Sequence, residues 1–138
     1  MNRPKINIKK TRLDKSIEFL TFFLLLGAAL LLAIWYAQLP ERVPIHFNWP
    51  TKDRNGMDSK DVLWAGPVIL GALILGMFKL NQYPWIFNYP FEIHEGNAER
   101  QYRIATRLLR WLNLLLAILC IVLTVLSLLD GLEVVKHQ

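Results

Sequence analysis

The chain has 138 residues, of which 54% are hydrophobic and only 20% are charged, and its mean hydropathy is +0.28. A chain this short and this apolar has too little polar sequence to cover a water-soluble core, so the composition excludes a soluble multidomain enzyme. It indicates a single integral-membrane domain over residues 1–138. The net charge of +5 is compatible with nucleic acid, anionic lipid or membrane orientation as its cause, and the positions of the charges decide between them.

The first apolar run covers residues 19–37 and carries no charge. At about 1.5 Å per residue, its length nearly equals the ~30 Å of a bilayer's hydrocarbon core, so we predict a transmembrane helix. The basic residues before it resemble the start of a signal peptide. The run is longer than the usual ~7 to 15 residues of such a peptide and is followed by no A-x-A cleavage site, which favours a retained anchor.

A proline-rich loop follows at residues 38–60. Apolar and polar residues alternate over 43–48, which predicts an extended segment whose apolar side chains, those of Val43, Ile45 and Phe47, lie on the helices. Asn55-Gly56 predicts a tight turn, and Ser59 is placed to cap the next helix. The candidate binding residues of this loop are Pro40, Pro44, His46, Phe47 and Asn48.

His46 is the loop residue most open to a chemical role. One interpretation is a pH-sensing or metal-binding group with Asp53 or Asp58 as its partner. The other is a histidine whose ring holds the loop through hydrogen bonds to backbone carbonyls. We favour the second, because one histidine and scattered carboxylates lack the spacing of metal ligands.

The second apolar run, residues 62–78, is shorter and contains several glycines, so it needs neighbouring helices. The small residues Ala29, Ala33 and Ala37 of the first run, and Ala72 and Gly76 of the second, predict close helix contacts on their faces. After the second run, aromatic residues occupy every second position, and two prolines block a helix. We predict an extended strip with one aromatic face, interpreted as an interfacial aromatic belt rather than a partner-docking strip. Its residues are Tyr83, Trp85, Phe87, Tyr89 and Phe91.

Asn97 is predicted to cap a helix that continues into the third apolar run, residues 111–129. Four arginines precede this run at spacings of three and four residues, so they share one helix face. They are Arg100, Arg103, Arg107 and Arg110. We interpret them as a lipid-facing basic stripe that reaches phosphate groups, each worth ~1 kcal/mol near an anionic surface. A partner-binding face is the alternative.

The basic residues also predict the orientation. Eleven of the Lys and Arg residues lie in the N-terminal tail and in residues 79–110, against five in residues 38–60 and at the C-terminal end. Positive flanks stay cytoplasmic, so we expect the N-terminus inside and the C-terminus outside. Topology then accounts for the basic charge, and no nucleic-acid partner is expected. No catalytic triad, metal-ligand cluster or phosphate-binding glycine loop is present in the sequence, and Cys120 stands alone, so we expect no enzyme activity, metal or cofactor.

The loop sequence Leu39-Pro40-Glu41-Arg42-Val43-Pro44-Ile45-His46-Phe47-Asn48, followed by Asp53 and Ser59-Lys60, resembles a signature of one bacterial membrane family. That family is the domain of unknown function at the N-terminus of SdpI-type immunity proteins. The resemblance continues through Asn88-Tyr89-Pro90 and Asn97-Ala98-Glu99-Arg100-Gln101-Tyr102, which adds Asn88 and Asn97 to the binding candidates. It implies protection against a secreted peptide toxin and capture of a cytoplasmic autorepressor.

The sequence departs from that family in two ways. Pro50-Thr51-Lys52-Asp53 replaces the usual Gly-x-Pro-Asp turn, and the second set of helices found in SdpI-like proteins is absent from this sequence. We therefore expect a short, stand-alone form: an all-α bacterial inner-membrane protein with three transmembrane helices, an ordered outer loop and an interfacial aromatic inner loop. Its expected role is a binding, regulatory or immunity-like module in contact with lipid and with a membrane or peptide partner, as a homo-oligomer or hetero-complex. A small oligomeric transporter or channel subunit is the alternative, although the spans carry no charge at mid-depth.

Overall fold

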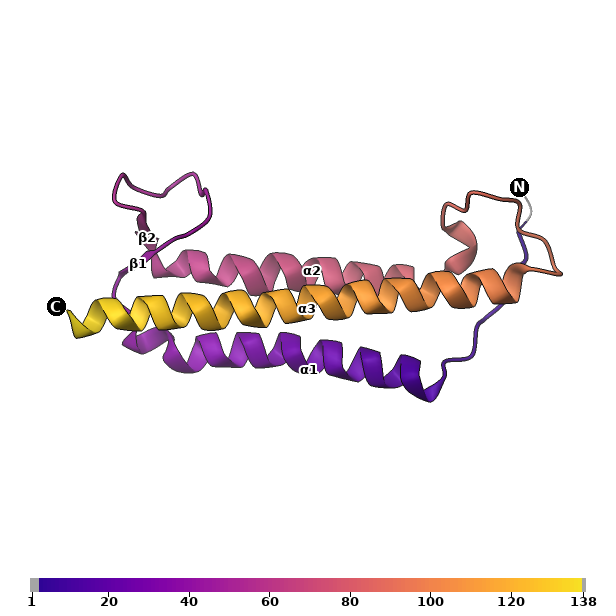
Figure 1. The fold of residues 1–138 in the computed structure, drawn as a ribbon, viewed down its shortest axis with the longest axis horizontal. Helices are drawn as coiled ribbons and strands as arrows, with labels where there is room; N and C mark the ends of the chain where they lie inside the picture. Colours follow the sequence, from indigo (N-terminus) through magenta and orange to yellow (C-terminus); the bar gives the residue numbers. More distant parts are fainter. Residues whose placement is uncertain (1–2, 138) are drawn as a thin grey trace.

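Three long helices lie side by side in the computed structural model, which describes residues 3–137 (Figure 1). They are α1 (Arg12–Trp35), α2 (Ala65–Leu80) and α3 (Ala98–Lys136), and each contains most or all of one apolar run. With their short 3-10 extensions, the segments Arg12–Gln38, Lys60–Leu80 and Ala98–Lys136 are long and apolar enough to cross a membrane. The chain thus has the architecture of a mostly helical, multi-pass membrane protein.

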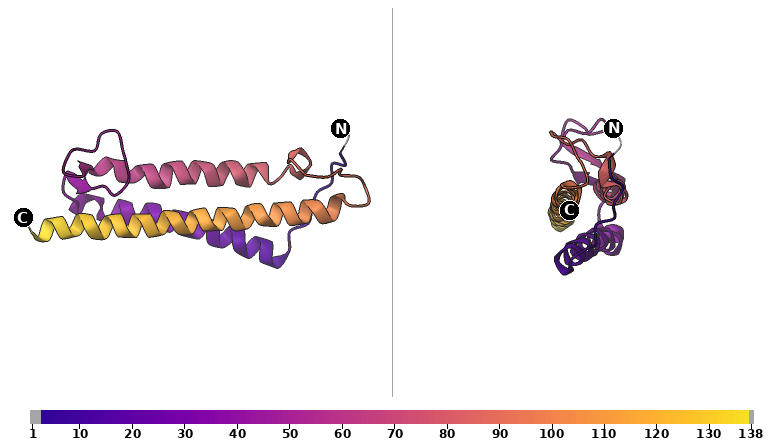
Figure 2. Two further views of the ribbon diagram at one scale, coloured as in Figure 1. Left: turned by 45° about the horizontal axis from the view of Figure 1, so that its top comes forward. Right: turned by 90° about the vertical axis from the view of Figure 1, so that its right-hand side faces the viewer.

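Helix α3 is the centre of the bundle. Both α1 and α2 pack along it, whereas α1 and α2 make few contacts with each other (Figures 1 and 2). The buried residues of α3 recur every three or four positions, so they form one continuous stripe along the helix. The stripe contains Tyr102, Thr106, Arg110, Asn113, Ala117, Cys120, Thr124, Leu128 and Gly131.

The close helix contacts are not made where the small-residue pattern predicts them. Ala33, Ala37, Ala72 and Gly76 are exposed, and Ala29 is only partly buried. Ala28 and Ala117 are instead fully buried. The prediction fails because alanines spaced four apart mark a possible contact face of an isolated helix, and they do not identify which face meets a neighbour.

Two helix starts show different capping. Thr11 and Asp14 form a capping box at α1: the Thr11 hydroxyl accepts from the Asp14 amide, and the Asp14 carboxylate accepts from the Thr11 amide at 2.8 Å. Asn97 is the N-cap residue of α3, as predicted, yet its side chain does not cap the helix. It folds back on the preceding loop, where Oδ1 accepts from the His94 amide and Nδ2 donates to the Glu92 carbonyl.

The loop between α1 and α2 contains a small antiparallel hairpin, which the sequence pattern suggests only as an extended segment. Strand β1 (Arg42–Pro44) pairs with β2 (Met57–Ser59). The predicted turn at Asn55-Gly56 is confirmed, with Gly56 in the left-handed region at φ +77°. The loop begins with the 3-10 turn η1 (Tyr36–Gln38), and Ser59 caps the 3-10 turn η2 (Lys60–Trp64) that leads into α2.

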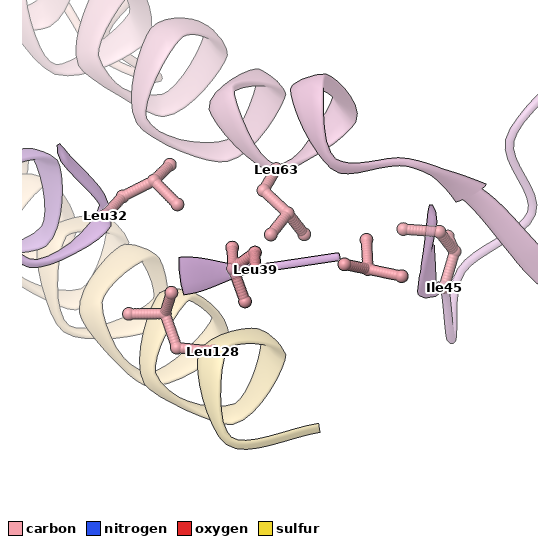
Figure 3. Close-up of a cluster of buried hydrophobic side chains, with 6 residues drawn as sticks. Leu32, Leu39, Ile45, Leu63 and Leu128 are labelled. Carbon is pink, nitrogen blue, oxygen red and sulfur yellow. The ribbon is translucent and has the colours of Figure 1, made fainter. Parts of the chain in front are cut away.

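The hairpin is attached to the helices by an apolar cluster (Figure 3). Its side chains come from α1, from the loop, from the 3-10 turn η2 that precedes α2, and from α3. They are Leu32, Leu39, Val43, Ile45, Leu63 and Leu128. Full burial of one such side chain stabilises a fold by about 1.5–3 kcal/mol relative to exposure. The cluster therefore fixes the loop on the end of the bundle, called here the hairpin end.

A second apolar cluster lies at the opposite end, called here the N-terminal end. Ile93, Ala98 and Tyr102 form its buried part, and Trp85 and Tyr89 pack against it. The predicted single-faced aromatic strip holds only over residues 85–90, where Trp85, Phe87 and Tyr89 are partly buried and the residues after each of them are exposed. The 3-10 turn η3 (Pro84–Ile86) interrupts the extended segment, so some rings pack inward while Tyr83 and Phe91 remain exposed.

Candidate functional site

At the hairpin end, His46 is bound to the last part of α3. Its Nε2 lies 2.7 Å from Oδ2 of Asp130, and its side chain is 74% exposed. Neither interpretation of His46 identified this partner. The ring holds the loop, but through a carboxylate 84 positions away in the sequence rather than through backbone carbonyls. Among residues 3–137 no group of three or more His, Cys, Asp or Glu side chains is arranged to hold a metal ion.

Replacement of His46 by alanine is expected to cost less than about 1 kcal/mol of stability, because an exposed polar contact of this kind contributes little. Thermal unfolding in detergent measures this effect. Asp130→Asn is the matched variant, since it keeps the shape and removes the charge. A loss above about 2 kcal/mol in His46→Ala would show that the ring does more than pair with Asp130.

The two acids proposed as His46 partners serve the loop itself. The carboxylate of Asp58 accepts from the Thr51 hydroxyl and from the Ser59 amide. The carboxylate of Asp53 accepts from the amides of Met57 and Asn55 at 2.9 Å and from the Arg42 guanidinium. These contacts, with the Met57 amide first, hold the pKa of Asp53 below the ordinary value of a carboxyl.

The turn should therefore loosen in acid. A carboxyl whose pKa is lower in the folded state contributes stability above its unfolded pKa of about 3.9, and the contribution disappears as the pH falls through the folded pKa. We expect hydrogen exchange at the amides of Met57 and Asn55 to accelerate below about pH 4, after correction for intrinsic rates. Asp53→Asn should remove this pH dependence. An unchanged acid response in that variant would assign it to another group.

An apolar groove of about 250 Å³ lies below the hairpin. Its walls include Ile69 and Leu70 from α2 and Leu123 from α3, and Phe47 and Trp49 from the loop complete it. The two aromatic rings meet edge to face, with centroids 5.8 Å apart. Phe47, predicted to lie on the helices with Val43 and Ile45, is instead 44% exposed, whereas the other two are buried.

The remaining candidates of this loop have more ordinary positions. Pro40 is partly buried, Pro44 belongs to β1, and Asn48 is exposed. Sequence reasoning did not identify Trp49 or the groove. The sequence does contain a signal for them: Phe47 and Trp49 are two aromatic residues spaced two apart in a loop that is expected to lie on the bundle.

At the N-terminal end, an ionic cluster joins α1 to α3. Asp14 is only 2% exposed, and its Oδ1 accepts from Nε of Arg107 at 3.1 Å and lies 3.6 Å from Nη1 of Arg110. Glu18, one turn later, accepts from Nε of Arg110 at 2.8 Å and from Nζ of Lys10 at 2.7 Å. Two acids of α1 thus meet two arginines of α3 at matching helical spacing.

The lipid-facing interpretation of the arginine stripe is therefore wrong for Arg110, which is buried, whereas Arg107 pairs with Asp14 and keeps a side chain that is 33% exposed. A charge inside an apolar bundle is stabilised most by an opposite charge nearby, and α1 supplies two. Arg103 pairs with Glu99 at 2.9 Å, and Arg100 is exposed. The spacing of Asp14 and Glu18 was the signal that could have identified this arrangement.

The N-terminal segment also packs on this end. Arg3 donates hydrogen bonds to the carbonyls of Trp85 and Phe87, and its guanidinium lies 5.3 Å from the centre of the Tyr89 ring. Burial raises the pKa of Tyr89 to about 12. Asn88, a candidate from the family resemblance, is exposed. The sequence pattern indicates only a topology signal at Arg3. In the structure Arg3 also holds the loop at residues 85–89.

The two ends of the bundle differ in chemistry. The hairpin end presents an apolar groove with an aromatic rim, and the N-terminal end presents paired charges and polar side chains. Comparisons with protein-family models, with curated proteins and with solved structures find no match. The function must therefore be argued from these two sites.

Proposed function

We propose that the protein is a multi-pass protein of a bacterial cytoplasmic membrane, with its N-terminal end inside and its hairpin end outside. Eleven of the sixteen Lys and Arg residues support this orientation, because basic flanks remain on the cytoplasmic side. The three apolar helices support membrane insertion. In this orientation the groove opens at the outer part of the spans, and the ionic cluster lies near the inner surface.

Within that orientation, the protein is a non-enzymatic binding module that captures a membrane-active peptide at its outer face. The groove below the hairpin is the observation that carries this proposal. Its lining is apolar, and Phe47 and Trp49 supply large surfaces of the kind that anchor peptide side chains. The resemblance of residues 39–48 to the loop of SdpI-type immunity proteins supports a peptide toxin as the occupant, and an immunity-like role as the consequence.

The test places a photo-crosslinking amino acid at Phe47 in cells and adds membrane-active peptides to the medium. We expect peptide adducts at Phe47. Phe91 is the matched control, because it is an aromatic residue of similar exposure, 46% against 44%, at the opposite end of the bundle. Adducts at both positions, or at neither, would contradict an outer peptide site.

A survival assay then tests the immunity-like role. Cells that carry the gene should survive a peptide that crosslinks better than cells that lack it, and Trp49→Ala should reduce the protection while Phe91→Ala leaves it unchanged. Crosslinking without any protection would support binding and exclude immunity. Adducts formed only with lipid would assign the groove to acyl chains.

A further inference from the structure

A second pocket, of about 200 Å³, lies at the N-terminal end between all three helices. Glu18 of α1, Phe78 of α2 and Arg110 of α3 line it. Lys10, from the segment before α1, and Asn81, directly after α2, complete the polar part of the lining. Unlike the groove at the hairpin end, this pocket is built largely from charged and amide side chains.

The charged groups of the lining leave an excess of one positive charge. Lys10 and Arg110 both bind the single carboxylate of Glu18. Within residues 3–137, Arg110 donates its hydrogen bond to Glu18 through Nε, and its Nη1 lies 3.6 Å from Asp14 Oδ1, so the terminal N–H groups make no hydrogen bond although Nη1 faces a carboxylate. Arg110 is only 6% exposed, so a ligand that reaches it meets a desolvated cation. Such a cation binds phosphate oxygens more strongly than a surface arginine does.

Asn81 indicates that the ligand of this pocket also carries a hydrogen-bond donor. It is 8% exposed, and its Nδ2 donates to the Thr106 carbonyl at 3.0 Å. Its Oδ1 is buried and has no hydrogen-bond partner among the described residues. An unpaired buried acceptor costs about 1–3 kcal/mol, so native proteins usually provide a donor for it. The pocket that Asn81 lines is the adjoining space from which a hydroxyl or ammonium group can approach.

The pocket also has an apolar boundary. The ring of Phe78 meets the ring of Phe22 edge to face, with centroids 5.1 Å apart, and Lys10 Nζ lies 5.2 Å from the Phe78 ring centre. Phe22 is one helical turn beyond Glu18, farther along the first apolar run. The ring pair thus separates the polar pocket from the apolar middle of the bundle, so a polar headgroup is the part of a lipid that fits here.

We propose that this pocket binds the headgroup of an anionic phospholipid of the inner leaflet, in which a phosphate diester is joined to a glycerol that carries hydroxyl groups. The phosphate binds Lys10 and Arg110, and a hydroxyl donates to Asn81 Oδ1. The excess positive charge of the lining favours a headgroup of net charge −1 over a zwitterionic one. The assignment rests on the proposed membrane orientation, which places this end at the anionic inner surface.

The experiment measures lipid retention by native mass spectrometry of the protein in detergent, with phosphatidylglycerol, phosphatidylethanolamine or phosphatidylcholine added in turn. We expect phosphatidylglycerol to be retained most strongly. Lys10→Met and Asn81→Ala should each weaken its retention about tenfold, the usual effect of losing one hydrogen bond in a charged site. Lys9→Met and Asn88→Ala, which change exposed residues of the same types outside the pocket, should change it less than about twofold.

Equal retention of the three lipids, or equal loss in the pocket and control variants, would overturn the proposal. Glycerol phosphate and inorganic phosphate, each added to protein that already holds phosphatidylglycerol, distinguish the sources of the ligand: displacement of the lipid by either at equal concentration would overturn the lipid assignment. Circular dichroism identifies any variant that fails to fold, and Asn81→Gln then replaces Asn81→Ala, with weaker retention again expected. Membrane insertion and peptide crosslinking at Phe47 are measured separately, so a failure of lipid binding alone leaves the proposed function standing.

Discussion

Arg110→Leu is expected to destabilise the protein by about 3 kcal/mol, because removal of one partner leaves buried carboxylates with uncompensated charge. The Arg110 side chain is 7% exposed and lies within reach of both Asp14 and Glu18. Asp14 keeps Arg107 and Glu18 keeps Lys10, so the effect falls at the lower end of the ~3–5 kcal/mol range for broken buried pairs. The measurement is thermal unfolding in detergent, monitored by circular dichroism.

Arg100→Leu is the matched control, since it makes the same substitution on the same helix at an exposed position. It should change stability by less than about 0.5 kcal/mol. The double variant Glu18→Leu, Arg110→Leu should recover part of the loss, because it removes a charge that has lost its partner. If Arg110→Leu were as stable as Arg100→Leu, the ionic cluster would not join α1 to α3 as described.

The second large effect is expected at Gly131, where α3 passes under the hairpin. A Cβ atom there would lie 2.7 Å from Leu39 Cδ2 and 3.4 Å from Val43 Cγ1. Both side chains are buried in the cluster that attaches the loop, so neither can move away freely. Gly131→Leu should destabilise the protein by about 1–3 kcal/mol through overpacking and should speed hydrogen exchange at the Ile45 amide.

Gly76→Leu is the corresponding control on α2. A Cβ atom at Gly76 would meet nothing within 4 Å, so the same substitution should be neutral or slightly stabilising, since glycine is a poor helix former. In the Gly131→Leu background, Leu39→Ala should cost less than it does alone, because it makes space for the new side chain. Equal behaviour of the two glycine variants would contradict the close packing of the hairpin on α3.

Local patterns predicted much of the local structure, although Phe47, expected to lie on the helices with Val43 and Ile45, is exposed. The uncharged runs lie in three helices, Asn55-Gly56 forms the turn, and Val43 and Ile45 are buried as their alternation with polar residues predicts. These features depend on residues a few positions apart, whose preferences are set by backbone geometry and by side-chain periodicity. Hydropathy alone identifies a helix of this kind, because a long apolar segment has few alternatives.

Partner choice could not be predicted in the same way. His46 and Asp130 are 84 positions apart, and Arg107 and Asp14 are 93 positions apart. Such pairs depend on the rotation and register of whole helices; the one-turn spacing of Asp14 and Glu18 indicates a charged face on α1, but it does not identify which residues meet that face. The arginines share a helix face, as predicted. Their spacing defines that face only relative to the axis of α3. Whether the face meets lipid or α1 depends on how the helices pack.

The central position of α3 has a consequence for synthesis. During translation α1 and α2 emerge first, and they have little surface with which to bind each other. Until α3 follows, Asp14 lacks both of its arginines and Glu18 keeps only Lys10, so the incomplete chain holds two helices and an incompletely neutralised acidic site. The third helix completes the charge balance and the packing in one step. A chain truncated before residue 98 should therefore be a substrate for membrane proteases, and insertion of the last helix should mark the point at which the protein becomes resistant.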